Sequence, residues 1–423
     1  MRPLSALPTA AIQVDPGSFF VIVLVAAIAA ILVALVPRRF CPPVVVLELV
    51  LGIVVGPHVL HLADLDAFIE FFSNLGLGML FYFAGYEIDF TRIRGRPLEL
   101  GGWGWLMSVV LAFAIGGLLV AAGIIVSDLY TAAAMATTAI GTLIPILRDN
   151  GELKTPFGRY LLGAGGVGEF GPILLVTLFF STQSALHETA ILIAFIALAI
   201  AVAVLSVRLA WRGWPALEKT FEASSQLAVR VTVVLVFGLV LLANKLGLDV
   251  LLGGMVAGLI TRVALKGHEL TIFESKLTAV GFGFFVPFFF VTSGIGYDLA
   301  ALGSTAAIGK LFLFLALFLV IRGAPALLLY RRLLGPHDRA ALAFYSATEL
   351  PLVVAITTIA LDAGEMRPST AAGLVGAAML STLVFPFVAQ ALRQRSKAEE
   401  PEAPGGGPSP LGEGPAVPGL AEG

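Results

Sequence analysis

Residues 161–176 read LLGAGGVGEFGPILLV and form the centre of an apolar run from 157 to 181. A helix of this length can cross the roughly 30 Å hydrocarbon core of a bilayer. The middle of the run carries a carboxylate, Glu169, and a charge at that depth costs about 2.5 to 3.5 kcal/mol on insertion scales. Glycines on either side of it allow neighbouring helices, or an ion, to approach the backbone closely. The stretch therefore predicts a membrane helix that contains an ionisable site.

The rest of the chain has the composition of a membrane protein. Of its 423 residues 58% are hydrophobic and 13% are charged, and the mean hydropathy is +0.97. These values lie outside the range of soluble globular proteins. We expect an all-α polytopic membrane protein with about 13 transmembrane helices. The expected spans are 17–37, 43–60, 68–86, 101–124, 127–147, 157–181, 188–211, 226–245, 248–265, 277–296, 305–331, 340–361 and 370–392.

Lysine and arginine are distributed unequally between alternate loops, and basic loops stay in the cytoplasm. One set of loops is rich in them, whereas the other offers only four. The basic set includes Arg38, Arg39, Arg92, Arg94, Arg96, Arg148, Lys154, Arg159, Arg208, Arg212, Arg262, Lys266, Arg331, Arg332, Arg393 and Arg395, and the other set is Arg2, Lys245, Lys310 and Arg367. This asymmetry predicts a multi-pass protein of the cell (inner) membrane with the N-terminus outside and the C-terminus in the cytoplasm.

The two ends of the chain differ from the membrane region 17–395. Residues 1–16 are expected to be extracytoplasmic. The first apolar run could be a cleaved signal peptide, but it is longer than such a segment and ends in a basic stop, so we favour an uncleaved span. Residues 396–423 are rich in Glu, Pro and Gly and predict a disordered cytoplasmic tail. The single cysteine, Cys41, excludes an intramolecular disulfide.

Two segments of the chain are similar to each other. LGLGMLFYFAGYEIDF at 75–90 and GFGFFVPFFFVTSGIGYDL at 281–299 are both rich in Phe and end in Gly, Tyr and an acid. If each marks the third span of a six-helix unit, the seventh span connects two units of opposite orientation. Inverted repeats of this kind are typical of secondary transporters, whose ion site lies near the midplane between the repeats.

On this alignment the fifth and twelfth spans correspond, and both contain helix-unfavourable residues at mid-depth. The first is interrupted around Thr137 to Pro145 and the second around Thr348 to Pro351. We expect two broken helices, because unwound backbone at this depth is tolerated where it lines a cavity. The alternative is that Pro145 and Pro351 only kink ordinary spans.

Six further side chains are candidates for the site. Arg322 lies far from the membrane surface and is always charged, so it can act as a fixed counter-charge; the alternative is a structural pair with Glu169. Glu349 is expected near a half-helix terminus in a supporting role, and Glu48 within the scaffold. The hydroxyls of Thr137, Thr138 and Thr142 are candidate ion ligands, although such hydroxyls often bond to their own helix.

Signatures of enzymes are absent from the sequence. The five histidines show no HxxxH or HExxH spacing, and GxSxG does not occur. Metal-dependent or serine hydrolysis is therefore not expected. We also expect no cofactor, no nucleotide-binding domain and no nucleic-acid partner.

Four stretches resemble the monovalent cation:proton antiporters of the Kef-type and sodium/proton exchanger group. They are LELVLGIVVGPHVL at 47–60, LGLGMLFYFAGYEIDF at 75–90, LGLDVLLGGMVAGLI at 246–260 and FFVPFFFVTSGI at 284–295. The resemblance implies a core domain, about 101–181 and 305–392, in which two broken helices cross. It also implies a dimerisation domain, a homodimer and an elevator-like motion of the core.

By this resemblance the ion-binding acid of the family falls on Glu169, its polar neighbour on Gly168, and the basic residue of the next core helix on Arg322. The chain departs from the family pattern in two places, since Glu replaces Asp and Gly replaces the preceding polar residue. One titratable site predicts one proton per cation and an electroneutral cycle.

The predicted function is antiport of Na⁺ or K⁺ against H⁺, with cation and proton competing at Glu169. The alternatives are a carrier or symporter of another solute on the same fold, and a membrane sensor that transports nothing.

Overall fold

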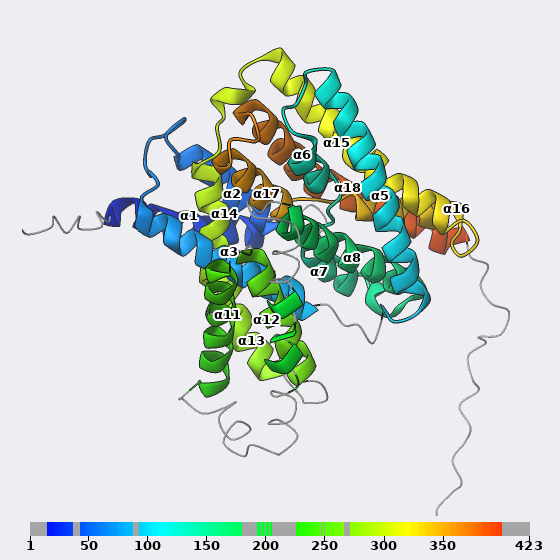
Figure 1. The fold of residues 1–423 in the computed structure, drawn as a ribbon, viewed down its shortest axis with the longest axis horizontal. Helices are drawn as coiled ribbons and strands as arrows, with labels where there is room; N and C mark the ends of the chain where they lie inside the picture. Colours follow the sequence, from blue (N-terminus) through cyan, green and yellow to red (C-terminus); the bar gives the residue numbers. More distant parts are fainter. Residues whose placement is uncertain are drawn as a thin grey trace, which may run out of the picture.

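The computed structural model describes residues 15–36, 43–87, 93–179, 226–265 except Gly247 and Asp249, and 271–399, with scattered positions between 193 and 204. The described residues form helices and turns and contain no strand (Figure 1). The expectations for residues 1–14, for most of the seventh span and for residues 400–423 lie outside the described part.

Helices occupy nearly the whole described chain. In the first half they are α1 (Pro16–Leu35), α2 (Val44–Val55), α3 (Ala67–Glu87), α5 (Arg96–Ala121), α6 (Asp128–Met135), α7 (Ile140–Asp149), η2 (Glu152–Lys154) and α8 (Pro156–Phe179). In the second half they are α11 (Leu227–Lys245), α12 (Val250–Ala264), α13 (Thr271–Val280), the π-helix η3 (Gly281–Phe285), α14 (Val286–Ile295), η4 (Ala300–Leu302), α15 (Thr305–Leu329), α16 (Pro336–Ser346), α17 (Pro351–Asp362) and α18 (Pro368–Glu399).

The protein is an all-helical polytopic membrane protein. Eight helical stretches among the described residues are long and apolar enough to cross a bilayer. The helices α2 and α12 are apolar but shorter. The expected number of about 13 spans and the inverted repeat stay predictions.

Both expected helix breaks are confirmed. The helix α6 ends at Met135 and α7 begins at Ile140, while α16 ends at Ser346 and α17 begins at Pro351. Pro351 starts the second half-helix, where its missing N–H costs nothing, whereas Pro145 lies inside α7. Ordinary kinks at these prolines are excluded, because four residues in each span leave the helical path.

The two breaks lie against each other in the interior. The backbone N–H of Ala139 donates to the carbonyl of Thr348 at 2.8 Å, and the hydroxyl of Thr138 donates to the carbonyl of Ser346 at 2.6 Å. These bonds satisfy polar backbone groups that the unwound segments would otherwise leave unpaired in an apolar environment. The breaks thus form one hydrogen-bonded crossing.

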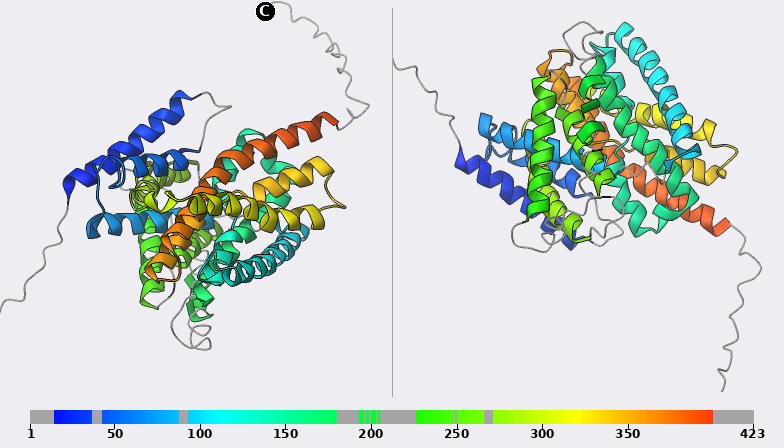
Figure 2. Two further views of the ribbon diagram at one scale, coloured as in Figure 1. Left: turned by 90° about the horizontal axis from the view of Figure 1, so that it is seen from above. Right: turned by 60° about the horizontal axis from the view of Figure 1, so that its bottom comes forward.

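The helices pack into two groups. The first group contains α1, α2, α3, α11, α12, α13, η3 and α14, and the second contains α5 to α8 and α15 to α18. Close contacts are frequent within each group and sparse between the groups. Figures 1 and 2 show α11 to α13 on one side of the molecule and α5, α15 and α16 on the other. A boundary with few contacts is one across which two parts can move.

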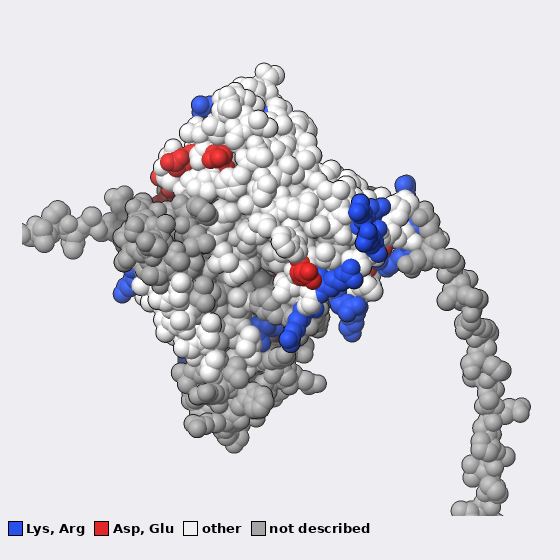
Figure 3. Space-filling model, turned by 45° about the vertical axis from the view of Figure 1, so that its right-hand side comes forward, with Lys and Arg blue, Asp and Glu red and all other residues white. Residues whose placement is uncertain are grey.

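Basic side chains mark one end of the second group. Exposed Arg148, Lys154, Arg331, Arg332 and Arg395 lie where α7 ends, α8 begins, α15 ends and α18 ends. Figure 3 shows Lys and Arg gathered over one part of the surface, with a broad white surface separating them from an acidic patch. We call this end of the molecule the basic end.

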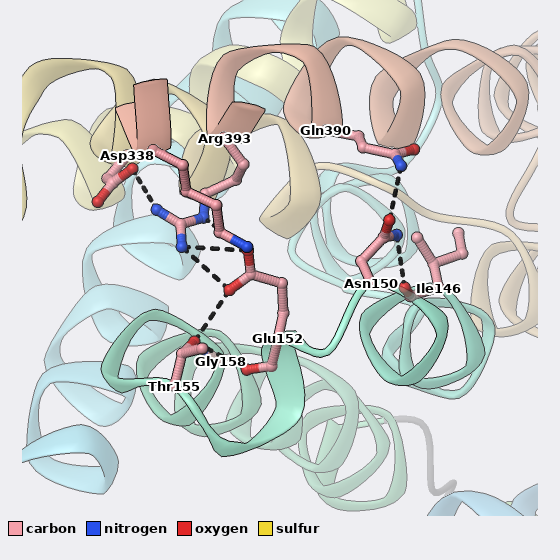
Figure 4. A network of polar contacts seen from close by, with 9 residues as sticks. Ile146, Asn150, Glu152, Thr155, Gly158, Asp338, Gln390 and Arg393 are labelled. Carbon is pink, nitrogen blue, oxygen red and sulfur yellow. Dashed lines mark hydrogen bonds and ion pairs between the residues drawn. The ribbon is translucent and has the colours of Figure 1, made fainter. Parts of the chain in front are cut away.

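A charge cluster ties the helices together there, and we call it the Arg393 cluster. Glu152, Asp338 and Arg393 form its buried part (Figure 4), and the exposed Lys397 adds a further bond. Arg393 donates from Nη2 to Glu152 Oε2 at 3.0 Å and from Nη1 to Asp338. Lys397 Nζ lies 2.8 Å from Glu152 Oε1. The guanidinium also lies over the ring of Phe157 at 4.3 Å, a favourable cation–π geometry. The cluster joins the starts of α8 and α16 to the end of α18.

A second contact continues this connection. Gln390 on α18 donates from Nε2 to Asn150 Oδ1 at 2.8 Å, and Asn150 follows directly on the end of α7 (Figure 4). The outer ends of both half-helices α7 and α16 are therefore tied to α18. These contacts fix, at the basic end, the two half-helices that lead into the crossing.

Candidate functional site

Glu169 lies on α8, 5% exposed, in a part of the helix where glycines allow close packing. A Cβ at Gly163 would lie 2.5 Å from the carbonyl oxygen of Pro97, and one at Gly171 would lie 2.4 Å from the ring of Trp105. Any larger residue at these two positions would push α8 away from α5. The glycines noted in the sequence therefore serve helix packing, as small residues do in membrane proteins.

Glu169 also lines a cavity of about 1700 Å³ between the two helix groups. One wall comes from α3 and α12 to α14, and the other from α7, α8, α17 and α18. The lining includes exposed residues of the basic end, among them Arg148 and Gln394, and reaches inward to Glu169, Phe290 and Pro351. Glu169 is therefore reached from the basic end of the molecule.

The carboxylate of Glu169 has spare hydrogen-bonding capacity. Its Oε2 atom is buried and has no hydrogen-bond partner among the described residues. Burying a polar group without a partner is costly, and in native proteins such a group usually has a functional reason. A carboxylate oxygen of this kind can accept a proton or coordinate a small cation.

A second acid, Glu87, faces the same cavity and was not among the expected site residues. It ends α3, it lines the cavity, and its charge acts on Glu169. Its Oε2 is likewise buried without a partner among the described residues. In the sequence Glu87 follows the Gly-Tyr pair of the repeated motif, where the span was expected to leave the membrane. It was therefore not predicted to belong to the site. Only the packing of α3 against α7 brings it towards α8.

Charged side chains surround the mouth of the cavity. Arg148 and Arg262 both line it, and their charges act on Glu87. Arg262 Nη1 lies 3.7 Å from Glu274 Oε1, and Tyr86 donates to the same carboxylate oxygen at 2.7 Å. Glu87 and Glu274 thus both have basic side chains nearby.

Arg322 is buried in α15 and binds the crossing. Its Nε and Nη2 donate to the hydroxyl of Thr138 at 3.0 and 2.7 Å. Nη1 donates to Ser108 Oγ at 3.1 Å and Nη2 to the carbonyl of Ala164 at 3.3 Å. Neither a hydrogen bond nor an ion pair joins Arg322 to Glu169 in the described part of the chain. The alternative of a permanent pair between these two residues therefore finds no support in the geometry.

The position of Arg322 explains why residue 168 is glycine. A Cβ at Gly168 would lie 2.3 Å from Arg322 Nη2 and 2.8 Å from Thr138 Oγ1. The guanidinium occupies the space that a side chain at this position would need. The polar residue expected here from the family pattern is thus replaced by an arginine that reaches in from α15.

Glu349 lies in the second break, fully buried, two residues before α17 begins. Neither of its carboxylate oxygens has a partner of full hydrogen-bond geometry among the described residues, but the hydroxyl of Thr137 lies near and the charge of Arg322 acts on it. Its backbone is fixed by Ser381, which accepts from the N–H of Glu349 and donates to its carbonyl, both at 3.0 Å. Arg322 is thus bonded to Thr138 in the first break, and its charge acts on Glu349 in the second.

The three threonines differ in their availability. Thr138 accepts from Arg322 and donates to Ser346, so its hydroxyl is occupied. Thr137 donates to the carbonyl of Ala134 at 3.1 Å, and Thr142 donates to that of Ala139 at 2.8 Å. Of the three, Thr142 lines the cavity. The hydroxyls of Thr137 and Thr142 thus bond the local backbone, which is the common behaviour of threonine in helices, whereas that of Thr138 bonds distant segments.

Glu48 lies apart from this site. It is 2% exposed on α2, its Oε2 has no partner within the described chain, and it does not line the cavity. The described residues also contain no group of three or more His, Cys, Asp and Glu side chains arranged to hold a metal ion.

Comparison with known proteins identifies the family of the chain. Residues 23–393 match the family described as sodium/hydrogen exchanger, transmembrane. The chain is 23% identical over 379 residues to "Putative Na(+)/H(+) antiporter YjbQ" of Bacillus subtilis, covering 85% of this chain and 60% of that protein. It is 26% identical over 279 residues to "Na(+)/H(+)-K(+) antiporter GerN" of Bacillus cereus, covering 63% of this chain and 68% of that protein.

A solved structure shares the fold. The sodium proton antiporter MjNhaP1 of Methanocaldococcus jannaschii at pH 8 aligns with a TM-score of 0.61 and 16% sequence identity. The alignment covers 90% of this chain and 97% of that one.

Proposed function

Because the chain belongs to the sodium/hydrogen exchanger family, we propose that it exchanges a monovalent cation, Na⁺ or K⁺, for a proton across the membrane. The observation that carries the proposal is the buried carboxylate of Glu169, which has an unpartnered oxygen at the inner end of a cavity open to one side. Cation and proton compete for this oxygen. Release of one is therefore coupled to binding of the other.

The crossing supplies the fixed part of this site. Arg322 is held by Thr138, Ser108 and the backbone, and its permanent charge faces Glu349. We assign Arg322 the role of counter-charge, Thr138 that of its holder, and Glu349 that of balancing the buried guanidinium. A cation at Glu169 is then attracted by Glu169 itself and by Glu87, while Thr137, Thr142 and Gly168 shape the surroundings.

The helix groups suggest how the site changes sides. Glu169, Arg322 and Glu349 all belong to the second group, whereas Glu87 belongs to the first. If the second group moves against the first in an elevator-like motion, Glu169 moves with it. Among the described acids of the second group, only Glu169 lines the cavity and can exchange a proton there. The proposed stoichiometry is thus one proton per cation, and the cycle is electroneutral. We further propose a homodimer and a cytoplasmic basic end, in line with the basic loops.

The test is dissipation of an imposed pH gradient in proteoliposomes after addition of Na⁺, K⁺ or Li⁺. The intact protein should dissipate the gradient with at least one cation, and Glu169→Gln should lose the response by about a hundredfold, because the amide cannot exchange a proton. The matched control is Glu99→Gln, an exposed acid on α5, which should behave as the intact protein. Full activity in Glu169→Gln would remove that residue from the mechanism, and a transport current would contradict electroneutrality.

A carrier of a larger solute is the second candidate, because the cavity volume of about 1700 Å³ exceeds what a bare cation needs. It predicts no response to any cation in the same assay although the protein is folded and inserted. A membrane sensor that transports nothing predicts that outcome too. It predicts in addition that Glu169→Gln behaves as the intact protein.

A further inference from the structure

The two ends of the boundary between the helix groups differ. At the basic end the cavity separates the groups, and its lining reaches inward as far as Glu169. At the opposite end none of the described residues of the loops 56–66, 122–127, 296–304 and 363–367 line it. Instead, the segment that connects α14 to α15, including η4, packs against α18. This end is closed.

Tyr297 makes a specific contact at this closed end. It follows α14 in the first group, is 9% exposed, and donates from its hydroxyl to the carbonyl of Ala372 on α18 at 2.8 Å. A Cβ at Gly376, one turn further on, would lie 2.7 Å from Leu311 Cδ1 and in ordinary contact with the hydroxyl oxygen at 3.4 Å, so glycine there lets α18 pack closely against α15 beside the phenol. The bond joins the two groups and is shielded from solvent.

The phenol remains a donor over the working range of pH. Burial raises the pKa of Tyr297 above its usual range, and the charge of Asp298 acts in the same direction. The hydroxyl therefore keeps its proton and stays available as a hydrogen-bond donor.

Neighbouring contacts anchor Tyr297 to the first group. Asp298 accepts from the N–H of Ala301 at 3.0 Å, which fixes the start of η4. The same carboxylate lies 3.3 Å from His58 Nε2, on the loop after α2. Tyr297 thus stands on a segment that is held by the first group and reaches across to the second.

We propose that Tyr297 is the latch of the closed end, and that its bond to Ala372 must break each time Glu169 is exposed to that side. The proposal rests on the proposed exchange. A site that opens to one end must lose the contacts that close the other, since an opening at both ends at once would let ions leak. Tyr297 is therefore a positioning residue that stabilises the state in which Glu169 is not exposed to the closed end.

The first test joins the latch chemically. In a Cys41→Ser background, cysteines at positions 297 and 372 are linked by a short bifunctional thiol reagent in proteoliposomes. Exchange should fall at least tenfold on linking and return when the linker is cleaved. The matched control links Ser73→Cys to Thr292→Cys, whose hydroxyls lie 2.7 Å apart within the first group, and should keep its exchange rate. Undiminished exchange in the linked 297/372 protein would overturn the latch.

The second test leaves transport aside, so that failure of the latch and failure of the proposed function are distinguishable. Tyr297→Phe keeps the ring and removes the hydroxyl. A cysteine at position 372, 3% exposed in the native chain, should then react about two- to tenfold faster with a membrane-impermeant thiol reagent added from the closed side, as loss of one hydrogen bond implies. Equal labelling rates with and without the Tyr297→Phe substitution would contradict the proposal whether or not the protein exchanges ions.

Discussion

The Arg393 cluster and the cavity around Glu169 bury charged side chains in opposite ways. In the cluster each carboxylate meets a basic partner, and Glu152 alone receives bonds from Arg393, Lys397 and Thr155. In the cavity Glu169 and Glu87 each keep a buried oxygen without a partner among the described residues. Satisfied charges fix helices in place, whereas unsatisfied ones stay available for a ligand. The difference separates the structural Arg393 cluster from the proposed transport site.

The largest expected effect on stability comes from breaking the satisfied cluster. Arg393→Met leaves the buried carboxylates of Glu152 and Asp338 without their shared partner, so we expect a loss of about 3 to 5 kcal/mol of unfolding free energy. Denaturant unfolding in detergent measures it, with exposed Arg395→Met as the control. If Arg393→Met were as stable as Arg395→Met, the Arg393 cluster would not stabilise the fold as described.

A smaller effect is expected at Gly168, where α8 packs against the guanidinium of Arg322. Gly168→Ala places a methyl group at a point 2.3 Å from Arg322 Nη2, so the guanidinium must move. We expect a loss of about 1 to 3 kcal/mol, typical of overpacking, together with at least a tenfold loss of exchange.

The control for this prediction lies two residues earlier on the same helix. A Cβ at Gly166 would have Ile93 Cδ1 at 3.9 Å as its nearest neighbour, so Gly166→Ala should be neutral or stabilising by up to about 1 kcal/mol. Equal stabilities of the two variants would show that Arg322 is not confined as described.

The cluster should also show a pH dependence. Burial alone would raise the pKa of Glu152, but hydrogen bonds from Arg393 and Lys397 outweigh it and hold the pKa below its usual range. A lowered folded-state pKa contributes stability above the unfolded value of about 4.3, and this is lost as pH falls through the folded value. The stability difference between the intact protein and Glu152→Gln should therefore shrink below about pH 4. A stability difference that grows on acidification would contradict a lowered pKa of Glu152 in the folded protein.

Sequence patterns could predict the parts of the fold that rest on local chemistry. Long apolar runs indicated the membrane class, and the residues around Thr137 and Pro351 indicated the breaks, because both signals lie within one segment. The environment of Glu169 was predicted only in part. Its burial follows from its place in an apolar run, but the approach of Glu87 depends on how α3 packs against α7.

Contacts between distant segments were beyond sequence reasoning. Arg393, Glu152 and Asp338 are separated by many residues. Arg393 was interpreted only as part of a basic loop, and no role was predicted for the two acids. The partners of Arg322 could not be predicted either, because a guanidinium has several donors and the sequence does not show which hydroxyl or carbonyl the packing brings to it. The reason for glycine at position 168 likewise depends on that packing, because Arg322 occupies the space beside it.

The most direct test of the central claim is the thermal stabilisation of the purified protein by Na⁺ or K⁺, measured from pH 5 to pH 9 for the intact protein, Glu169→Gln and Arg393→Met. A ligand that binds the folded state raises its stability. We predict that the cation stabilises the intact protein and Arg393→Met, less so at low pH where protons compete, and leaves Glu169→Gln unchanged. Equal stabilisation of Glu169→Gln and the intact protein would contradict the claim that the unpartnered carboxylate is the ion site.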